Sequence, residues 1–184
     1  MCSSLRPTSR PRPFLRRGIA LQGIQGKGHV GPGHQVLING AGGGSGMYAV
    51  QLAQLLGAEV TGVDNSEMLG FMRSLGAGHV IDYTREDFTR NERTYDLILD
   101  LAAHRSAFAY RGSLKPAGRY LYVGGSVATL LQIVLIGPLI GTAGGKKIRL
   151  LAFRQGAQHL AGTPRAALPG GKDRHGHRRP LSAK

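Results

Sequence analysis

The feature that most constrains the fold is a glycine-rich stretch between two apolar segments. Residues 35–39 have the composition of a buried β-strand, residues 40–46 include five glycines, and residues 47–56 have the apolar spacing of an amphipathic helix. Glycines allow a tight turn and a close approach of the backbone to a ligand. The first turn of the following helix offers unpaired N–H groups and a positive dipole end. This order of strand, turn and helix predicts a site for the pyrophosphate of a dinucleotide.

The spacing within the turn fits a relaxed dinucleotide-binding motif. The strict pattern Gly-x-Gly-x-x-Gly is absent, but Ala41, Gly43 and Gly46 fill the three positions of Ala-x-Gly-x-x-Gly. Asp64 follows the next apolar segment, about 20 residues on, where a ribose-binding carboxylate is expected. A flexible turn between an unrelated strand and helix is the alternative. The flanking segments and Asp64 favour the dinucleotide site.

Strand-like and helix-like segments continue to alternate along the chain. The expected strands are residues 35–39, 59–63, 80–81, 95–100, 120–123 and 148–153, and the later expected helices are residues 67–75 and 106–114. Gly76, and the pair Pro116 and Gly118, are breakers that would end these two helices. Such alternation predicts parallel βαβ units. The expected fold class is therefore α/β, a Rossmann-type doubly wound parallel sheet of six strands.

Eight short segments carry a family resemblance. They are residues 20–23 (ALQG), 30–33 (VGPG), 36–41 (VLINGA), 49–53 (AVQLA), 74–77 (SLGA), 79–83 (HVIDY), 95–100 (YDLILD) and 121–125 (LYVGG). Together they make residues 19–153 resemble the cofactor domain of the medium-chain dehydrogenase/reductase superfamily, in its zinc-independent, quinone-oxidoreductase-like branch. The expected domains are a leader at 1–18, a dinucleotide-binding Rossmann domain at 19–153 and a tail at 154–184.

The resemblance implies hydride transfer between NAD or NADP and a small carbonyl, enone or quinone. The implied cofactor contacts are Gly43, Gly44, Ser45 and Gly46 at the pyrophosphate, Asp64 and Asn65 at the adenosine ribose, Tyr83 at the adenine, and Gly124 and Gly125 at the nicotinamide. An ordinary half-exposed aromatic after a strand is an equal alternative for Tyr83. No catalytic residue is assigned, because Asp82, Asp96 and Asp100 fit turn and strand-end roles better than catalytic ones.

Two positions after the second expected strand bear on the choice of cofactor. Asp64 would accept hydrogen bonds from the ribose hydroxyls of NAD but would repel the 2′-phosphate of NADP. Met68 stands where NADP-dependent members of the resembled family commonly have a basic residue. NAD is therefore favoured, although Arg73 and Arg85 are basic side chains that could reach a phosphate.

The basic charge is concentrated at the two ends of the chain. The formal net charge is +14, of which residues 18–150 contribute only +3. The Arg-rich start is similar to a mitochondrial presequence, but Pro7, Pro11 and Pro13 disfavour the helix that a presequence forms. A basic tail can hold nucleic acid without specificity, yet no aromatic residue follows Phe153 for base stacking. Both ends are expected to be disordered, either as solvated tails or as out-of-frame translation around a truncated gene.

Composition also bears on membrane, metal and redox chemistry. Residues 120–145 carry no charge and are long enough to span a membrane, but glycines interrupt them, and the resemblance implies a strand followed by a loop and helix at the nicotinamide or at a homodimer contact. Cys2 is the only cysteine, so zinc sites of the cysteine-rich kind and intrachain disulfides are not expected. A reducing, cytoplasmic location is expected.

Two classes of function remain open from sequence. The first is an oxidoreductase of the quinone-reductase type, here without the separate substrate domain that full members of the resembled family have. The second is a nucleotide-binding module or remnant that does not turn over a substrate.

Overall fold

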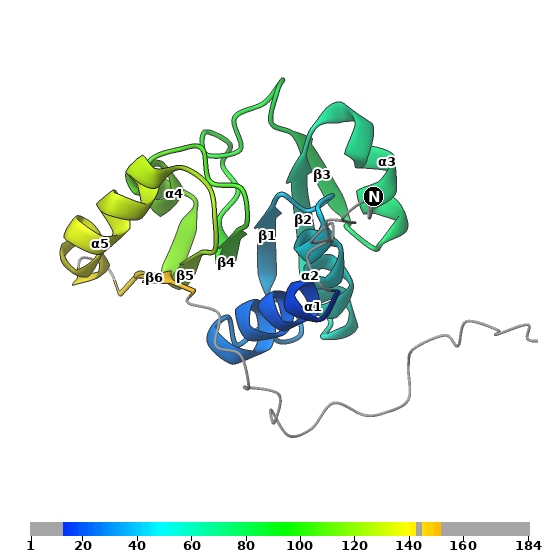
Figure 1. Ribbon diagram of the computed structural model, residues 1–184, viewed down its shortest axis with the longest axis horizontal. Coiled ribbons are helices and arrows are strands. Elements are labelled where there is room, and N and C mark those ends of the chain that lie inside the picture. The colour runs from blue at the N-terminus through cyan, green and yellow to red at the C-terminus, as the bar shows by residue number, and fades with distance from the viewer. Residues whose placement is uncertain (1–12, 143–144, 152–184) are drawn as a thin grey trace, which may run out of the picture.

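A computed structural model describes residues 13–142 and 145–151, which form one twisted sheet covered by helices (Figure 1). The strands are β1 (Gln35–Asn39), β2 (Glu59–Asp64), β3 (His79–Asp82), β4 (Tyr95–Asp100), β5 (Leu114–Tyr122) and β6 (Lys147–Leu150). They lie in the order β3-β2-β1-β4-β5-β6, and each pair of neighbours is parallel. This order confirms the predicted six-stranded Rossmann-type sheet.

Helices cover both faces of the sheet. They are α1 (Pro13–Leu21), a π-helical segment η1 (Gln22–Lys27), α2 (Gly44–Leu55), a short 3-10 helix η2 (Ser66–Met68), α3 (Leu69–Ser74), α4 (Ala107–Gly112) and α5 (Val127–Thr142). Side chains alternate between the faces of β1: Val36 and Ile38 pack with α1, α2 and α3, whereas Leu37 packs with α4 and α5. Because both faces are covered, the central strands are continuous apolar runs.

Helix α1 corrects the expectation for the start of the chain. Residues 13–18 belong to the predicted disordered leader, but they are helical here. Pro13 is the first residue of α1, a position where a missing N–H costs nothing and the fixed φ of proline suits a helix. Proline at this position therefore begins a helix instead of preventing one. The remaining leader, residues 1–12, and the predicted tail at 154–184 lie outside the described residues.

Strand β5 begins earlier than the sequence indicates. Pro116 and Gly118 were expected to end a helix, but that helix, α4, ends at Gly112, and both residues lie inside β5. The strand accommodates them because its pairing with β4 shifts register between Tyr95 and Leu97, where Ala117 adopts a φ of 62°. The strand after the long uncharged stretch, predicted at 148–153, is β6; it ends at Leu150, and residues 152–153 lie outside the described residues.

The uncharged stretch itself forms the end of β5 and helix α5. Strand, loop and helix follow one another there as the resemblance implied. Within the described ranges, no helix combines the length and the apolar character that crossing a membrane requires.

Candidate functional site

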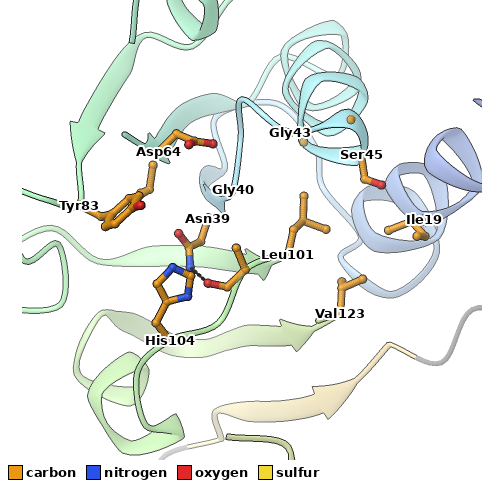
Figure 2. Close-up of a pocket in the computed structure, with 14 residues that line it drawn as sticks. Ile19, Asn39, Gly40, Gly43, Ser45, Asp64, Tyr83, Leu101, His104 and Val123 are labelled. Carbon is orange, nitrogen blue, oxygen red and sulfur yellow. Dashed lines mark hydrogen bonds between the residues drawn. The ribbon is translucent and has the colours of Figure 1, made fainter. Parts of the chain in front are cut away.

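A cavity of about 440 Å³ lies at the carboxyl ends of the central strands (Figure 2). Its walls come from the ends of β1 and β2 and from residues that follow β3, β4 and β5, together with the first turn of α2 and one residue of α1. Chain order in the sheet reverses between β1 and β4, so the connections after these two strands leave toward opposite faces and open a crevice. Ligands of doubly wound sheets bind in such a crevice.

The glycine turn joins the end of β1 to the start of α2. Gly40 has a φ of 81°, and its N–H and that of Ala41 donate to the carbonyl of Val63, at 2.9 and 3.1 Å. These bonds tie the turn to β2. A β-carbon on Gly46 would lie 2.7 Å from the backbone of Ala41 and closer still to the carbonyl oxygen of Gly40, so only glycine fits there. Helix α2 begins at Gly44, and its first turn faces the cavity.

Asp64 holds the turn from the opposite side. Its Oδ2 accepts a hydrogen bond from the N–H of Gly42 at 2.9 Å, and its Oδ1 accepts one from the N–H of Asn65 at 2.9 Å. The side chain of Asn65 caps η2 by accepting from the N–H of Met68 at 3.3 Å. Met68 packs against Gly42, where a β-carbon would lie 2.7 Å from the Met68 Cβ. Asp64 lines the cavity, whereas Asn65 does not.

Two aromatic rings meet at the edge of the cavity on the Asp64 side. Tyr83 follows β3 and His104 follows β4, and their rings are in edge-to-face contact with centroids 5.6 Å apart (Figure 2). Tyr83 is 40% exposed. His104 is also exposed, and both residues line the cavity.

A buried hydrogen-bond network forms the floor below the turn. Asp100, at the end of β4, is fully buried, and its carboxylate accepts from the Asn39 amide and from the Tyr120 hydroxyl, each at 2.8 Å. Burial raises the pKa of the Asp100 carboxyl above its ordinary value, and the hydrogen bonds from Tyr120 and Asn39 oppose that rise. The network links the ends of β1, β4 and β5, so Asp100 has a structural role.

The other two strand-end carboxylates are also engaged locally. Asp82 accepts hydrogen bonds from Ser66 and Thr84, and these hydrogen bonds lower the pKa of its carboxyl. Asp96 accepts from the N–H of Gln35 and pairs with Lys115, each at 2.8 Å. None of these carboxylates lines the cavity.

The structure brings six of the ten predicted cofactor residues together around the cavity: Gly43, Gly44, Ser45, Gly46, Asp64 and Tyr83. Of the others, Ala41 is fully buried beneath the turn, and Asn65 caps η2. Gly124 and Gly125 follow β5 but pack on the neighbouring strand end: Gly125 pairs with Ala103, where a β-carbon would lie 2.7 Å from the Ala103 Cα. The residue before them, Val123, lines the cavity instead.

The sequence reasoning missed several lining residues. They are Ile19, Asn39, Gly40, Val63, Leu101, Ala102, His104 and Val123. All except Ile19 lie at, or just after, the carboxyl end of a predicted strand. The rule that these ends share one edge of a parallel sheet would have identified the region. Ile19 lies on α1, which the sequence analysis did not expect.

A family comparison identifies the chain more directly. The family model described as zinc-binding dehydrogenase matches residues 44–158. The chain belongs to this dehydrogenase family. The match confirms the predicted membership of the medium-chain dehydrogenase/reductase superfamily and corresponds to its cofactor-binding domain.

Individual dehydrogenase relatives agree with this assignment. The chain is 36% identical over 104 residues to a zinc-type alcohol dehydrogenase-like protein of Schizosaccharomyces pombe, covering 53% of the chain and 29% of the relative. It is 37% identical over 86 residues to a quinone oxidoreductase-like protein 2 homolog of Nematostella vectensis, covering 46% and 24%. The structure of the quinone oxidoreductase from Coxiella burnetii superimposes with a TM-score of 0.65 and 26% identity, covering 83% and 45%. The chain thus spans less than half the length of each relative.

The name of the dehydrogenase family raises the question of zinc. Across residues 13–142 and 145–151, no three His, Cys, Asp or Glu side chains lie together as metal ligands would. The described residues therefore do not fit a zinc site, and no step proposed below uses a metal.

Proposed function

We propose that the chain is the dinucleotide-binding part of an NAD(P)-dependent oxidoreductase of the quinone-reductase and alcohol-dehydrogenase type. The observation that carries this proposal is the cavity at the reversal of sheet order, with the glycine turn and the first turn of α2 on one wall and Asp64 on another. When bound there, the nicotinamide would supply a hydride to a small carbonyl, enone or quinone. The names of the relatives, an alcohol dehydrogenase-like protein and quinone oxidoreductases, support the carbonyl and the quinone.

The lining of the cavity supports one direction for the dinucleotide. Gly43, Gly44 and Ser45 would hold the pyrophosphate, because the N-terminus of α2 offers N–H donors and a positive dipole end. The side with Asp64, Tyr83 and His104 would hold the adenosine, with the carboxylate at the ribose and the rings at the base.

The opposite side would hold the nicotinamide. Its lining residues Ile19, Leu101 and Val123 are apolar, and such a surface excludes water from the ring. We also propose that Gly124 and Gly125, which follow Val123, lie close to the nicotinamide. A fully occupied cavity would thus place the reactive ring where the apolar residues gather.

We also propose how the protein assembles and where it is located in the cell. Four exposed apolar side chains of α5, Val127, Leu131, Val134 and Leu135, support a homodimer contact on this helix. The single cysteine supports a reducing, cytoplasmic location.

The direct test of the proposal is calorimetric titration of the purified chain with NADH and with ADP. Saturable binding of both is expected, together with a rise in the melting temperature as each ligand is added. A chain that shows no binding at millimolar NADH would contradict the proposal. Binding without turnover is expected both for the proposed oxidoreductase part and for the alternative, a nucleotide-binding module that is not an enzyme, so this titration tests cofactor binding alone.

The choice between NAD and NADP gives a second test. NADH is expected to bind about tenfold more tightly than NADPH, because the Asp64 carboxylate accepts from ribose hydroxyls and repels a 2′-phosphate. In the double variant Asp64→Ser with Met68→Lys, one repulsion is removed and one attraction is added, so the ratio of the two dissociation constants should approach or pass one.

The ratio of the two dissociation constants is the quantity to compare, because Asp64 also accepts a hydrogen bond from the N–H of Gly42. Losing this bond should weaken the binding of both cofactors alike. Asp64→Ser with Met68→Gln is the matched control, since it has the same serine and a neutral side chain of similar length. A wild-type preference for NADPH would show that the assignment of Asp64 is wrong.

A further inference from the structure

Arg16, on α1, lies against the first turn of α2. A β-carbon built on Gly44 would lie 2.6 Å from the Arg16 Cζ and closer still to its Nη1, so the guanidinium occupies the space just outside the Gly44 backbone. Gly44 is the first residue of α2, and it lines the cavity together with Gly43 and Ser45. Ile19, one helical turn after Arg16 and on the same face of α1, lines the cavity as well.

The charges around this guanidinium are unusual. The N-terminal end of α2 carries a partial positive charge, and its first turn has no acidic residue to offset it. In the described part of the chain, the salt bridges use Arg85, Arg90, Arg105 and Lys115, and Arg16 takes part in none of them. The guanidinium and the helix end are therefore two positive groups side by side, next to a residue that lines the cavity.

The neighbouring arginine has a different environment. Arg17 lies over the ring of Tyr48, with its Cζ 5.1 Å from the ring centroid. It is exposed, and its cation–π contact is with the fifth residue of α2. Of this consecutive pair, Arg16 is the one whose guanidinium lies against Gly44, a residue that lines the cavity.

We propose that Arg16 is an additional phosphate-binding residue, whose guanidinium donates hydrogen bonds to the pyrophosphate of a dinucleotide held at the first turn of α2. An anion between the guanidinium and the helix end would neutralise both positive groups, and the planar fork of arginine matches phosphate oxygens. This inference rests on the proposed function. Arg16 lies outside residues 44–158, which the family model matches, so the contact is assigned from the geometry of this chain.

The test compares Arg16→Gln with Arg17→Gln. The two variants remove the same charge from adjacent positions of one helix, so any general effect of charge on affinity is shared. Titrations with NADH, ADP, inorganic pyrophosphate and adenosine would be followed by calorimetry, with thermal unfolding of each variant as a measure of folding. Arg16→Gln should weaken NADH, ADP and pyrophosphate by about tenfold and leave adenosine unchanged. Arg17→Gln should change all four by less than about twofold.

Two further measurements keep the inference falsifiable. Arg16→Lys keeps the positive charge but loses the planar, bidentate donor geometry of the guanidinium. Its affinities for NADH, ADP and pyrophosphate should therefore lie between those of wild type and Arg16→Gln. The dependence of NADH affinity on salt should be weaker in Arg16→Gln than in wild type.

The outcomes separate the inference from the proposed function. If wild type binds neither NADH nor ADP, the proposed function is wrong. If wild type binds both and Arg16→Gln binds them equally well, only the role of Arg16 is wrong. Tighter binding by Arg16→Gln would show that the guanidinium obstructs the site, and this result too would overturn the inference.

Discussion

Gly43→Val is expected to lower NADH affinity by about a hundredfold or more while the protein stays folded. The backbone of Gly43 has a φ of −75° and a ψ of 172°, which any residue can adopt. Apart from the carbonyl oxygen of Gly40 at 3.2 Å, a β-carbon there meets nothing within 4 Å. The valine side chain would therefore take up space in the cavity that Gly43 lines. Losing glycine at the N-cap of α2 should cost about 1 kcal/mol of unfolding free energy.

Gly46→Val should lose binding for a different reason. Its β-carbon would press on the backbone of Gly40 and Ala41, which cannot move aside without breaking the turn. We expect the free energy of unfolding to fall by about 3 kcal/mol or more, in addition to the loss of binding. Denaturant unfolding together with NADH calorimetry distinguishes the two variants, because only Gly46→Val should be strongly destabilised.

Gly70→Val is the matched control for both substitutions. Gly70 lies on the exposed side of α3, and a β-carbon there meets nothing within 4 Å. Binding should be unchanged in this variant. If Gly43→Val bound NADH as tightly as Gly70→Val does, the pyrophosphate could not lie at the glycine turn.

Strand positions were predictable from sequence because the central strands are buried on both faces. Such strands are continuous apolar runs bounded by polar or glycine residues, and the segments 35–39 and 95–100 were expected with the bounds that the structure has. The start of β5 was not predictable. From the local sequence, Pro116 and Gly118 predict an interruption of regular secondary structure. The segment is a strand only because its pairing with β4 shifts register.

The lining of the candidate site was predictable from sequence where a single motif supplies the residues, but not where the lining depends on contacts between distant segments. Spacing alone identified the turn at 40–46 and the carboxylate of Asp64. His104 has no motif and faces the cavity only because its loop follows β4 at the edge where β1 and β2 also end. Arg16 and Ile19 required the knowledge that Pro13 begins a helix packed on α2.

The chain of 184 residues by itself is expected to bind NADH yet to turn it over many orders of magnitude more slowly than typical enzymes do. Among the described residues, the side of the cavity that we propose for the nicotinamide is lined by the apolar side chains of Ile19, Leu101 and Val123, none of which can donate a proton to a reduced carbonyl. The chain also spans only 45% of the Coxiella burnetii quinone oxidoreductase.

The expected size of the effect follows from what a closed cleft contributes. Orienting the reactants and excluding water can each account for several kcal/mol of an enzyme's barrier reduction, and every 1.36 kcal/mol is about a factor of ten in rate. NADH consumption would be measured with quinones and α,β-unsaturated carbonyls, with Gly43→Val as the control for turnover outside the cavity. A rate of about 1 per second or more, lost in Gly43→Val, would contradict the prediction. A polar side chain on the cavity wall, such as Ser45, Tyr83 or His104, would then have to supply the proton.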